Sequence, residues 1–484
     1  ASRFLGMKFE IAVFAGLAGI LLCSMLGGMR AVTWTQIAQY IVLIIAYLTP
    51  IVILSTQHFG IPIPELTYGK AISDIIAREG QMLKDGLAVA CTAASCPAGA
   101  LKPHIEPFIN YSPLNFFGII FCMMVGTASL PHILMRYFTT PSVKEARDSV
   151  AWSLLFIFLL YFSAPAYAAF SKLEVYTNII GRDLTQIRPW LFNWGELGLI
   201  QICGKNAASL DAVIAACKAI AGHPGVLRFQ DFVINTDVIV LSTPEIAGLP
   251  YVISGLVAAG GLAAALSTAD GLLLAIANAL SHDIYYKMID PNAPTIRRLT
   301  VARVLLFFVA VASAALAATR PSDILAMVGW AFSLAMAGNF PALTLGIWWK
   351  RATTQGAIAG IIAGWGICLF YLVTTRYFPQ AGVNYFGMSS LLNPETRQPL
   401  IDVAKVMADA RWVADVPASA ANPMANRVGW FDLNNINCGL LGMPLGFLVI
   451  YVVSLMTPEP SKEMQAFIDE IRKPRGRTVL EEKS

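Results

Sequence analysis

About nine apolar stretches, each long enough to cross the roughly 30 Å hydrocarbon core of a bilayer as a helix, constrain this chain more than any other feature. They lie near residues 8–28, 35–55, 114–136, 149–170, 251–281, 298–319, 324–349, 355–378 and 437–457. The chain is 56% hydrophobic and 13% charged, whereas soluble domains are about a quarter charged. The sequence therefore predicts an all-α polytopic membrane protein.

Basic residues in the short connections predict the orientation of the spans, because Lys and Arg accumulate on the cytoplasmic side. One side carries them at Arg30, Arg136, Lys144, Arg147, Lys287, Arg297, Arg298, Lys350, Arg351 and in the C-terminal tail. The long connections 56–113, 171–250 and 379–436 lie on the opposite side. We expect a membrane domain over residues 1–458 and a cytoplasmic tail over 459–484 that contains one short helix.

Four cysteines fall in the long outer connections. Cys91 and Cys96 share the first, and Cys203 and Cys217 share the second. Two local pairs on the non-cytoplasmic side are typical of disulfides in an oxidising compartment. The alternative is four cysteines that lie in these loops by chance.

One face of the helix predicted over 251–281 is small and polar. At about 100° per residue, one arc contains or borders the side chains of Ser267, Thr268, Asp270, Asn278 and Ser281. Adjacent hydroxyls with helix carbonyls are uncharged oxygen ligands that suit a Na⁺ ion which must bind and leave. Alternatively, the hydroxyls bond only to carbonyls one turn earlier. Asp270 is a candidate for coupling, because acids inside spans are costly, or else a structural partner of a neighbouring span.

The third span is irregular. The segment MMVGTASLPHILMRYF carries Gly126, Thr127, Ser129 and Pro131 at mid-membrane, followed by His132. Proline removes a backbone donor, and freed backbone groups at that depth must face protein or a water-lined cavity. Discontinuous helices of this kind carry substrate and ion sites in secondary transporters. A simple proline kink repaired by the two hydroxyls, with His132 as an ordinary interior group, is the alternative.

The seventh span repeats this pattern in the segment VGWAFSLAMAGNFPALTLGIWW. Gly338, Asn339 and Pro341 are expected to interrupt it near the middle, and Trp330 and Ser333 lie earlier on the same helix. Two interrupted spans and one polar stripe exceed what a stable bundle needs. Together they indicate a transport pathway.

These motifs resemble the sodium:solute symporter family. The segment AALSTADGLLLAIANALSHDIY is similar to its signature, and GTASLPHILMRYFT and NFPALTLGIWWKRATTQGA resemble the broken and proline-containing helices of the bacterial cation/acetate symporter branch. The segment GGMRAVTWTQI also sides with that branch, because Gln36 stands where amino-acid and sugar members commonly have Asp. The resemblance runs from Phe9 to the tail.

The resemblance implies a LeuT-like fold of five-plus-five inverted repeats. It implies Na⁺ ligands at the Ala264 carbonyl and the hydroxyls of Ser267 and Thr268. The first broken helix of the repeat, which supplies the other half of the family's sodium site, has no counterpart here. The chain begins at Ala1 rather than Met, and we expect it to be N-terminally truncated, lacking three spans and most of a fourth.

The resulting hypothesis is Na⁺-coupled symport of a short monocarboxylate, above all acetate, in the bacterial inner membrane. The substrate pathway would use Gly126, Thr127, Ser129, His132, Trp330, Ser333 and Asn339. Alternatives are another solute such as pyruvate, propionate or proline, proton coupling through Asp270 or His132, and, remotely, a sensor module. No cofactor beyond the coupling ion and no enzymatic or nucleic-acid-binding motif is expected. Membrane lipid is the expected environment, and a partner subunit is left open.

Overall fold

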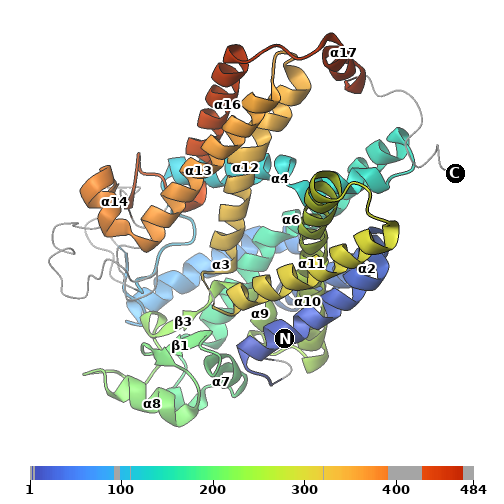
Figure 1. Cartoon of the computed structure of the whole chain (residues 1–484). Coiled ribbons are helices and arrows are strands. Elements are labelled where there is room, and N and C mark those ends of the chain that lie inside the picture. The colour runs from blue at the N-terminus through green and yellow to red at the C-terminus, as the bar shows by residue number, and fades with distance from the viewer. Residues whose placement is uncertain are drawn as a thin grey trace. The chain divides into compact units, whose positions relative to one another are not determined.

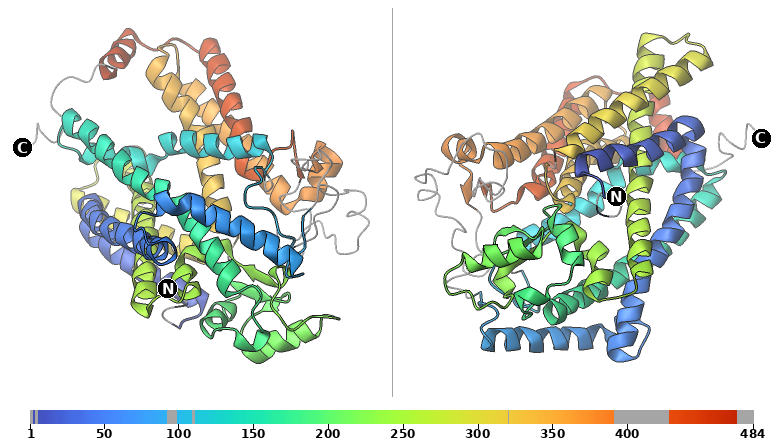
Figure 2. Two further views of the ribbon diagram at one scale, coloured as in Figure 1. Left: turned by 180° about the vertical axis from the view of Figure 1, so that it is seen from behind. Right: turned by 90° about the horizontal axis from the view of Figure 1, so that it is seen from below.

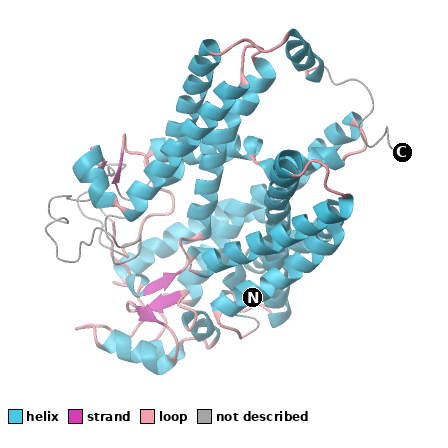
Figure 3. Cartoon of the chain, in the orientation of Figure 1, coloured by secondary structure: helices cyan, strands magenta, loops and turns pink. Residues whose placement is uncertain are grey.

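The computed structural model describes residues 3, 6–91, 99–108, 111–319, 321–390 and 428–472. The chain forms two compact units, the first of Ala1–Glu106 with Asp148–Pro321 and the second of Pro107–Arg147 with Ser322–Ser484 (Figure 1). Helices dominate both units, and the described strands are short (Figure 3).

The first unit is built mainly from long apolar helices and one strand-containing segment outside them. Its helices are α2 (Phe9–Phe59), α3 (Pro64–Lys84), α6 (Val143–Asn178), α7 (Trp190–Gly195), α8 (Leu210–Lys218), α9 (Ile239–Ile246), α10 (Tyr251–Asn278), a π-helical continuation η5 (Ala279–Ile289) and α11 (Thr295–Ala318). Three 3₁₀ turns are η2 (Leu184–Gln186), η3 (Phe229–Asp231) and η4 (Thr236–Val238). Strand β1 (Ile200–Ile202) pairs antiparallel with β2 (Lys205–Asn206) and β3 (Phe232–Ile234), in the order β2-β1-β3.

The second unit packs three long helices together. Its elements are α4 (Pro113–Ser129), α5 (Pro131–Leu134), η1 (Met135–Thr139), α12 (Ile324–Trp348), α13 (Thr354–Tyr377), α14 (Pro379–Phe386), β4 (Ser389–Ser390), β5 (Val428–Gly429), η6 (Asn435–Asn437), α16 (Gly439–Met456) and α17 (Lys462–Ile471). Helices α12, α13 and α16 lie side by side (Figure 1). The short tail helix expected from the sequence is α17, and residues 473–484 lie outside the described part of the chain.

The multi-pass prediction is confirmed. Among the described residues, seven helices are long and apolar enough to cross a membrane, or eight if the bent pair Pro113–Ser129 and Pro131–Tyr137 is one span. Eight of the nine predicted spans correspond to these. The remaining one, near 8–28, appears as the shorter apolar helix Phe9–Leu21 within α2.

Helix α2 consists of two limbs that meet at Gly28. This residue has φ 58° and ψ −161°, a conformation that favours glycine because side chains are strained there. The right panel of Figure 2 shows the resulting sharp bend in the blue helix. The two limbs correspond to the first two predicted spans, 8–28 and 35–55.

The segment between α6 and α10 is held together by a disulfide and a buried ion cluster. Cys203 and Cys217 are joined in the disulfide. Asp231, nearly buried, accepts hydrogen bonds from Arg228 Nε at 2.8 Å and from His223 Nε2 at 3.0 Å. Burial raises the pKa of the Asp231 carboxyl, but these hydrogen bonds outweigh it and leave the pKa below its ordinary value. Cys91 is also disulfide-bonded, and its predicted partner Cys96 lies outside the described residues.

The predicted interruption of the seventh span is wrong. Helix α12 runs unbroken from Ile324 to Trp348 with Pro341 inside it. Proline at this position leaves the carbonyl of Ala337, one turn earlier, without its helical donor. A methyl group built on Gly364 of α13 would lie 2.3 Å from that carbonyl oxygen, and one on Gly446 of α16 3.0 Å from it. The two glycines let α13 and α16 approach α12 closely, so their backbones surround the freed Ala337 carbonyl. We attribute the continuity of α12 past Pro341 to these contacts.

Candidate functional site

The predicted sodium ligands gather around one carbonyl on α10. Ser267 Oγ donates to the Ala264 carbonyl at 2.9 Å, and Thr268 Oγ1 donates to the same oxygen at 3.2 Å. The three oxygens therefore share one turn of helix. The hydroxyl protons are directed at the carbonyl, so the hydroxyl lone pairs remain free to coordinate a cation. The hydroxyls do bond to a carbonyl one turn earlier, as the alternative interpretation expects. These bonds use the hydroxyl protons and not the lone pairs that would coordinate Na⁺.

Helix α2 contacts α10 beside these ligands with two polar side chains. Gln36 Nε2 donates to the Ser267 carbonyl at 2.5 Å, and Ser24 Oγ donates to Asp270 Oδ1 at 2.7 Å. Asp270 is only 1% exposed. The sequence singled out Gln36 through the resemblance alone, and it missed Ser24, because an isolated serine in an apolar span carries no signal about its partner.

The small residues of the polar stripe allow the two helices to approach closely. A methyl group built on Gly260 would lie 2.4 Å from Ala46 Cβ on α2. Ser281 is buried and Asn278 is half-buried, as expected for the stripe. Leu273, which is not part of the stripe, is also buried, in a cluster with residues of α2 and α11. The helix is therefore covered on more than its polar face.

The third span is broken as predicted. Helices α4 and α5 meet at Leu130 with a bend of 47°. Thr127 Oγ1 donates to the Met123 carbonyl at 2.7 Å, and Ser129 Oγ lies 3.0 Å from the Gly126 carbonyl. The Ser129 hydroxyl thus serves a carbonyl beside the break, whereas the Thr127 bond is an ordinary one to the carbonyl one turn earlier.

Past the break, His132 is a half-buried group with an unused nitrogen. Within the described part of the chain, its buried Nδ1 has no hydrogen-bond partner. A buried ring nitrogen without a partner is a candidate for binding a solute or a proton.

Helix α12 meets the break from the other side. Asn339 Nδ2 donates to the Ser129 carbonyl at 3.2 Å. A methyl group built on Gly126 would lie 2.6 Å from the carbonyl oxygen of Phe332. Three predicted pathway residues, Gly126, Ser129 and Asn339, are therefore brought together where the backbone is interrupted.

Trp330 and Ser333 bond instead to the turn that precedes α16. Trp330 Nε1 donates to Asn435 Oδ1 at 3.2 Å, and the buried Ser333 hydroxyl donates to the Ile436 carbonyl. The guanidinium of Arg376, buried at the end of α13, lies 4.7 Å from the centre of the Trp330 ring. Arg376 was not among the predicted site residues, although an arginine at the end of an apolar span is itself a signal.

The two sets of candidates belong to different units. Ala264, Ser267, Thr268 and Asp270 lie in the first, and the residues of the broken span and of α12 lie in the second. Each set is assembled by contacts within its own unit.

Comparison with known proteins gives one family. The chain matches the sodium:solute symporter family over residues 2–183 and 226–364. It is also similar to an uncharacterized symporter of Cupriavidus necator, with 36% identity over 550 aligned residues that cover 98% of this chain and 73% of the relative. All the candidate residues above except Arg376, Asn435 and Ile436 fall in the matched segments, whereas residues 184–225 lie between them.

Proposed function

Because the chain belongs to the sodium:solute symporter family, we propose that it couples the entry of Na⁺ to the uptake of a short monocarboxylate, with acetate as the preferred solute. The family and the apolar helices make it a multi-pass membrane transporter. The solute, the ion-binding residues, the inner-membrane location and the cytoplasmic C-terminus are parts of the proposal.

The observation that carries the sodium assignment is the convergence of oxygens on α10. The hydroxyl oxygens of Ser267 and Thr268 lie 2.9 Å and 3.2 Å from the Ala264 carbonyl oxygen. Hard cations prefer such oxygen ligands, and a set without net charge allows the ion to leave in each cycle. Gln36 gives the neighbouring Ser267 carbonyl a second donor, which anchors the turn that presents the hydroxyls.

The support for a small carboxylate comes from the break in the third span and from the resemblance of its sequence to acetate permeases. The site needs few contacts for such a solute. The Asn339 amide and the unused Nδ1 of His132 supply polar groups from α12 and α5. Ion and solute would be coupled because both favour the same conformation of the transporter.

Uptake measurements on proteoliposomes test the coupling. Labelled acetate should accumulate when an inward sodium gradient is imposed, and the Ser267→Ala, Thr268→Ala double variant should lose this dependence. Ser254→Ala, on the same helix, is the matched control and should transport normally. Sodium-dependent uptake by the double variant at the wild-type level would refute the assignment.

Two further measurements distinguish sodium coupling from proton coupling, and acetate from other solutes. A pH gradient imposed without sodium should drive no uptake, whereas uptake under that gradient would favour proton coupling through Asp270 or His132. Unlabelled pyruvate, propionate and proline should each compete more weakly than acetate. A stronger competitor among them would replace acetate as the solute.

A further inference from the structure

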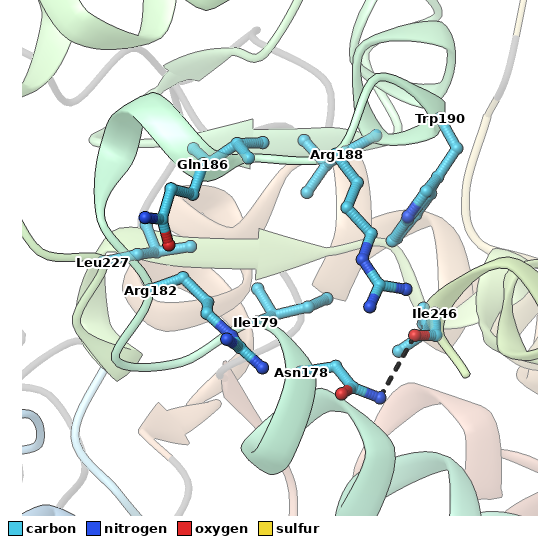
Figure 4. Close-up of a pocket in the computed structure, with 10 residues that line it drawn as sticks. Asn178, Ile179, Arg182, Gln186, Arg188, Trp190, Leu227 and Ile246 are labelled. Atoms are coloured by element: carbon cyan, nitrogen blue, oxygen red, sulfur yellow. Dashed lines mark hydrogen bonds between the residues drawn. The ribbon is translucent and has the colours of Figure 1, made fainter. Parts of the chain in front are cut away.

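A small cavity lies outside the apolar spans, in the segment that connects α6 to α10. Its volume is about 100 Å³, and its walls come from the end of α6, the turn η2, the start of α7 and residues near β3 and α9. Figure 4 shows the side chains of Arg182 and Arg188 reaching towards Asn178 from two sides. All the lining residues belong to the first unit.

Three donor groups at this cavity have no acceptor among the residues that the structure describes. Neither the Arg182 nor the Arg188 guanidinium has a hydrogen-bond or ion-pair partner among the described residues, and both side chains are exposed to solvent. The Nε1 of Trp190 is buried and, in the described structure, also unpaired. Buried donors are nearly always satisfied in folded proteins, so an unpaired indole N–H in a cavity wall that also carries two arginines indicates a missing acceptor.

The nearby acids cannot fill this role, because each is already engaged. Glu174 is nearly buried and binds His58 Nε2 and Asn178 Nδ2, each at 2.5 Å. Glu245 accepts from Trp194 Nε1 at 2.6 Å and from Arg3 at 3.1 Å. The cavity itself is lined by two arginines and by no aspartate or glutamate. Its local charge is therefore positive.

Size and wall chemistry narrow the class of ligand. Sites for drug-sized molecules measure roughly 300–1,000 Å³, so this cavity admits a molecule of a few heavy atoms. The remaining wall is aliphatic, formed by residues that include Ile179, Leu191, Leu227 and Ile246. Guanidinium groups bind the two oxygens of a carboxylate in a bidentate manner. The apolar wall suits the alkyl group of a carboxylate better than the additional oxygens of a phosphate.

We infer that this cavity binds a short aliphatic carboxylate, held by the guanidinium groups of Arg182 and Arg188 and by the indole N–H of Trp190, with its alkyl end against the aliphatic wall. Arg188 and Trp190 lie in residues 184–225, between the two segments that match the family. The site is thus separate from the candidates on α10, and it does not rest on the transported solute.

Residue-resolved chemical protection tests the site on the full chain in detergent. Phenylglyoxal modifies accessible arginines, and mass spectrometry reports each one separately. Saturating acetate should slow the modification of Arg182 and Arg188 by about tenfold, and neutral acetamide should not. Arg147, which is exposed and remote in the sequence, is the internal control and should react at an unchanged rate.

A Trp190 variant tests the role of the indole N–H, and competing anions test whether the cavity selects a carboxylate. Trp190→Phe should raise the half-protecting acetate concentration about tenfold, while Trp152→Phe, at an exposed indole on α6, should not change it. Equal protection by phosphate or chloride, or no protection by acetate, would overturn the carboxylate assignment. Protection should persist in the Ser267→Ala, Thr268→Ala variant, so a failure of the proposed symport is distinguishable from a failure of this site.

Discussion

The amide of Gln36 donates a hydrogen bond to the backbone carbonyl of Ser267 at 2.5 Å and so joins α2 to α10 beside the predicted sodium ligands. A mid-helix carbonyl that accepts an additional side-chain donor is held in place twice, once by its own helix and once by the neighbour. This bond orients the turn that carries the Ser267 and Thr268 hydroxyls. It also makes a residue on another helix part of the proposed ion site.

Replacing Gln36 should therefore weaken sodium activation. Gln36→Leu keeps the volume but removes the second donor of the Ser267 carbonyl, which retains its helical donor, and we expect a loss of about 0.5–1.5 kcal/mol at the site. The sodium concentration for half-maximal uptake should rise by about two- to tenfold. Gln39→Leu, on the same helix, is the control. Equal sodium dependence in the two variants would show that the bond does not shape the site.

The buried carboxyl of Asp270 should depend on Ser24 for its stability. Ser24→Ala removes the donor from an acid that is 1% exposed, and we expect a loss of about 1–3 kcal/mol in the free energy of unfolding. Asp270→Asn retains an oxygen that can accept from Ser24, so its effect should be smaller. Thermal unfolding in nanodiscs measures both, and an unchanged midpoint for Ser24→Ala would contradict the prediction.

Gly126 should tolerate no side chain. Its added methyl group would lie 2.6 Å from the Phe332 carbonyl oxygen, which belongs to backbone that cannot move aside easily. Gly126→Ala should separate α4 from α12 and cost about 1–3 kcal/mol. Gly346→Ala is the matched control, because its methyl group meets nothing within 4 Å and should raise helix stability. Similar unfolding midpoints for the two variants would argue against close packing at Gly126.

The segment around the disulfide should loosen in acid. The pKa of Asp231 is lowered from its usual 3.8, since the hydrogen bonds from Arg228 and His223 outweigh burial. A depressed carboxyl pKa contributes stability that is fully present above 3.8 and is lost as pH falls through the folded-state value. The rate at which a phosphine opens the Cys203–Cys217 disulfide should therefore stay constant down to about pH 5 and rise below about pH 4.

Substitutions at two aspartates check the origin of this acid effect. Asp231→Asn removes the ionisable group, so the phosphine should open the disulfide rapidly at every pH. Asp211→Asn, on the exposed start of α8, should behave like the wild type. A flat pH profile in the wild type would refute the role of Asp231.

The spans could be predicted because each is a local property of the sequence. Apolar length places α10, α11 and α13, and the missing donor of Pro131 places the break at Leu130. The same reasoning failed at Pro341, where the outcome depends on Gly364 and Gly446 from other helices. A proline indicates that a carbonyl is freed, but the neighbours decide whether the helix breaks.

In the candidate site, too, local groupings could be predicted from the sequence and contacts between distant residues could not. Ala264, Ser267 and Thr268 lie within one turn, so helical spacing was enough to group them. The bonds from Gln36 and Ser24, and the stacking of Arg376 on Trp330, join residues far apart in the chain. The walls of the carboxylate cavity likewise come from residues as far apart in the sequence as Arg182 and Ile246. Helical or strand periodicity does not predict contacts between such distant residues.

The bond between Ser24 and Asp270 also bears on how the protein is made. The two residues are 246 positions apart, so both limbs of α2 are synthesised long before their partner helix exists. Until then Ser24 and Gln36 are polar groups in a newly inserted segment without their final acceptors. We therefore expect release of this segment from the insertion machinery to wait for α10, which would make nascent chains that stop before residue 270 preferred targets for membrane quality control.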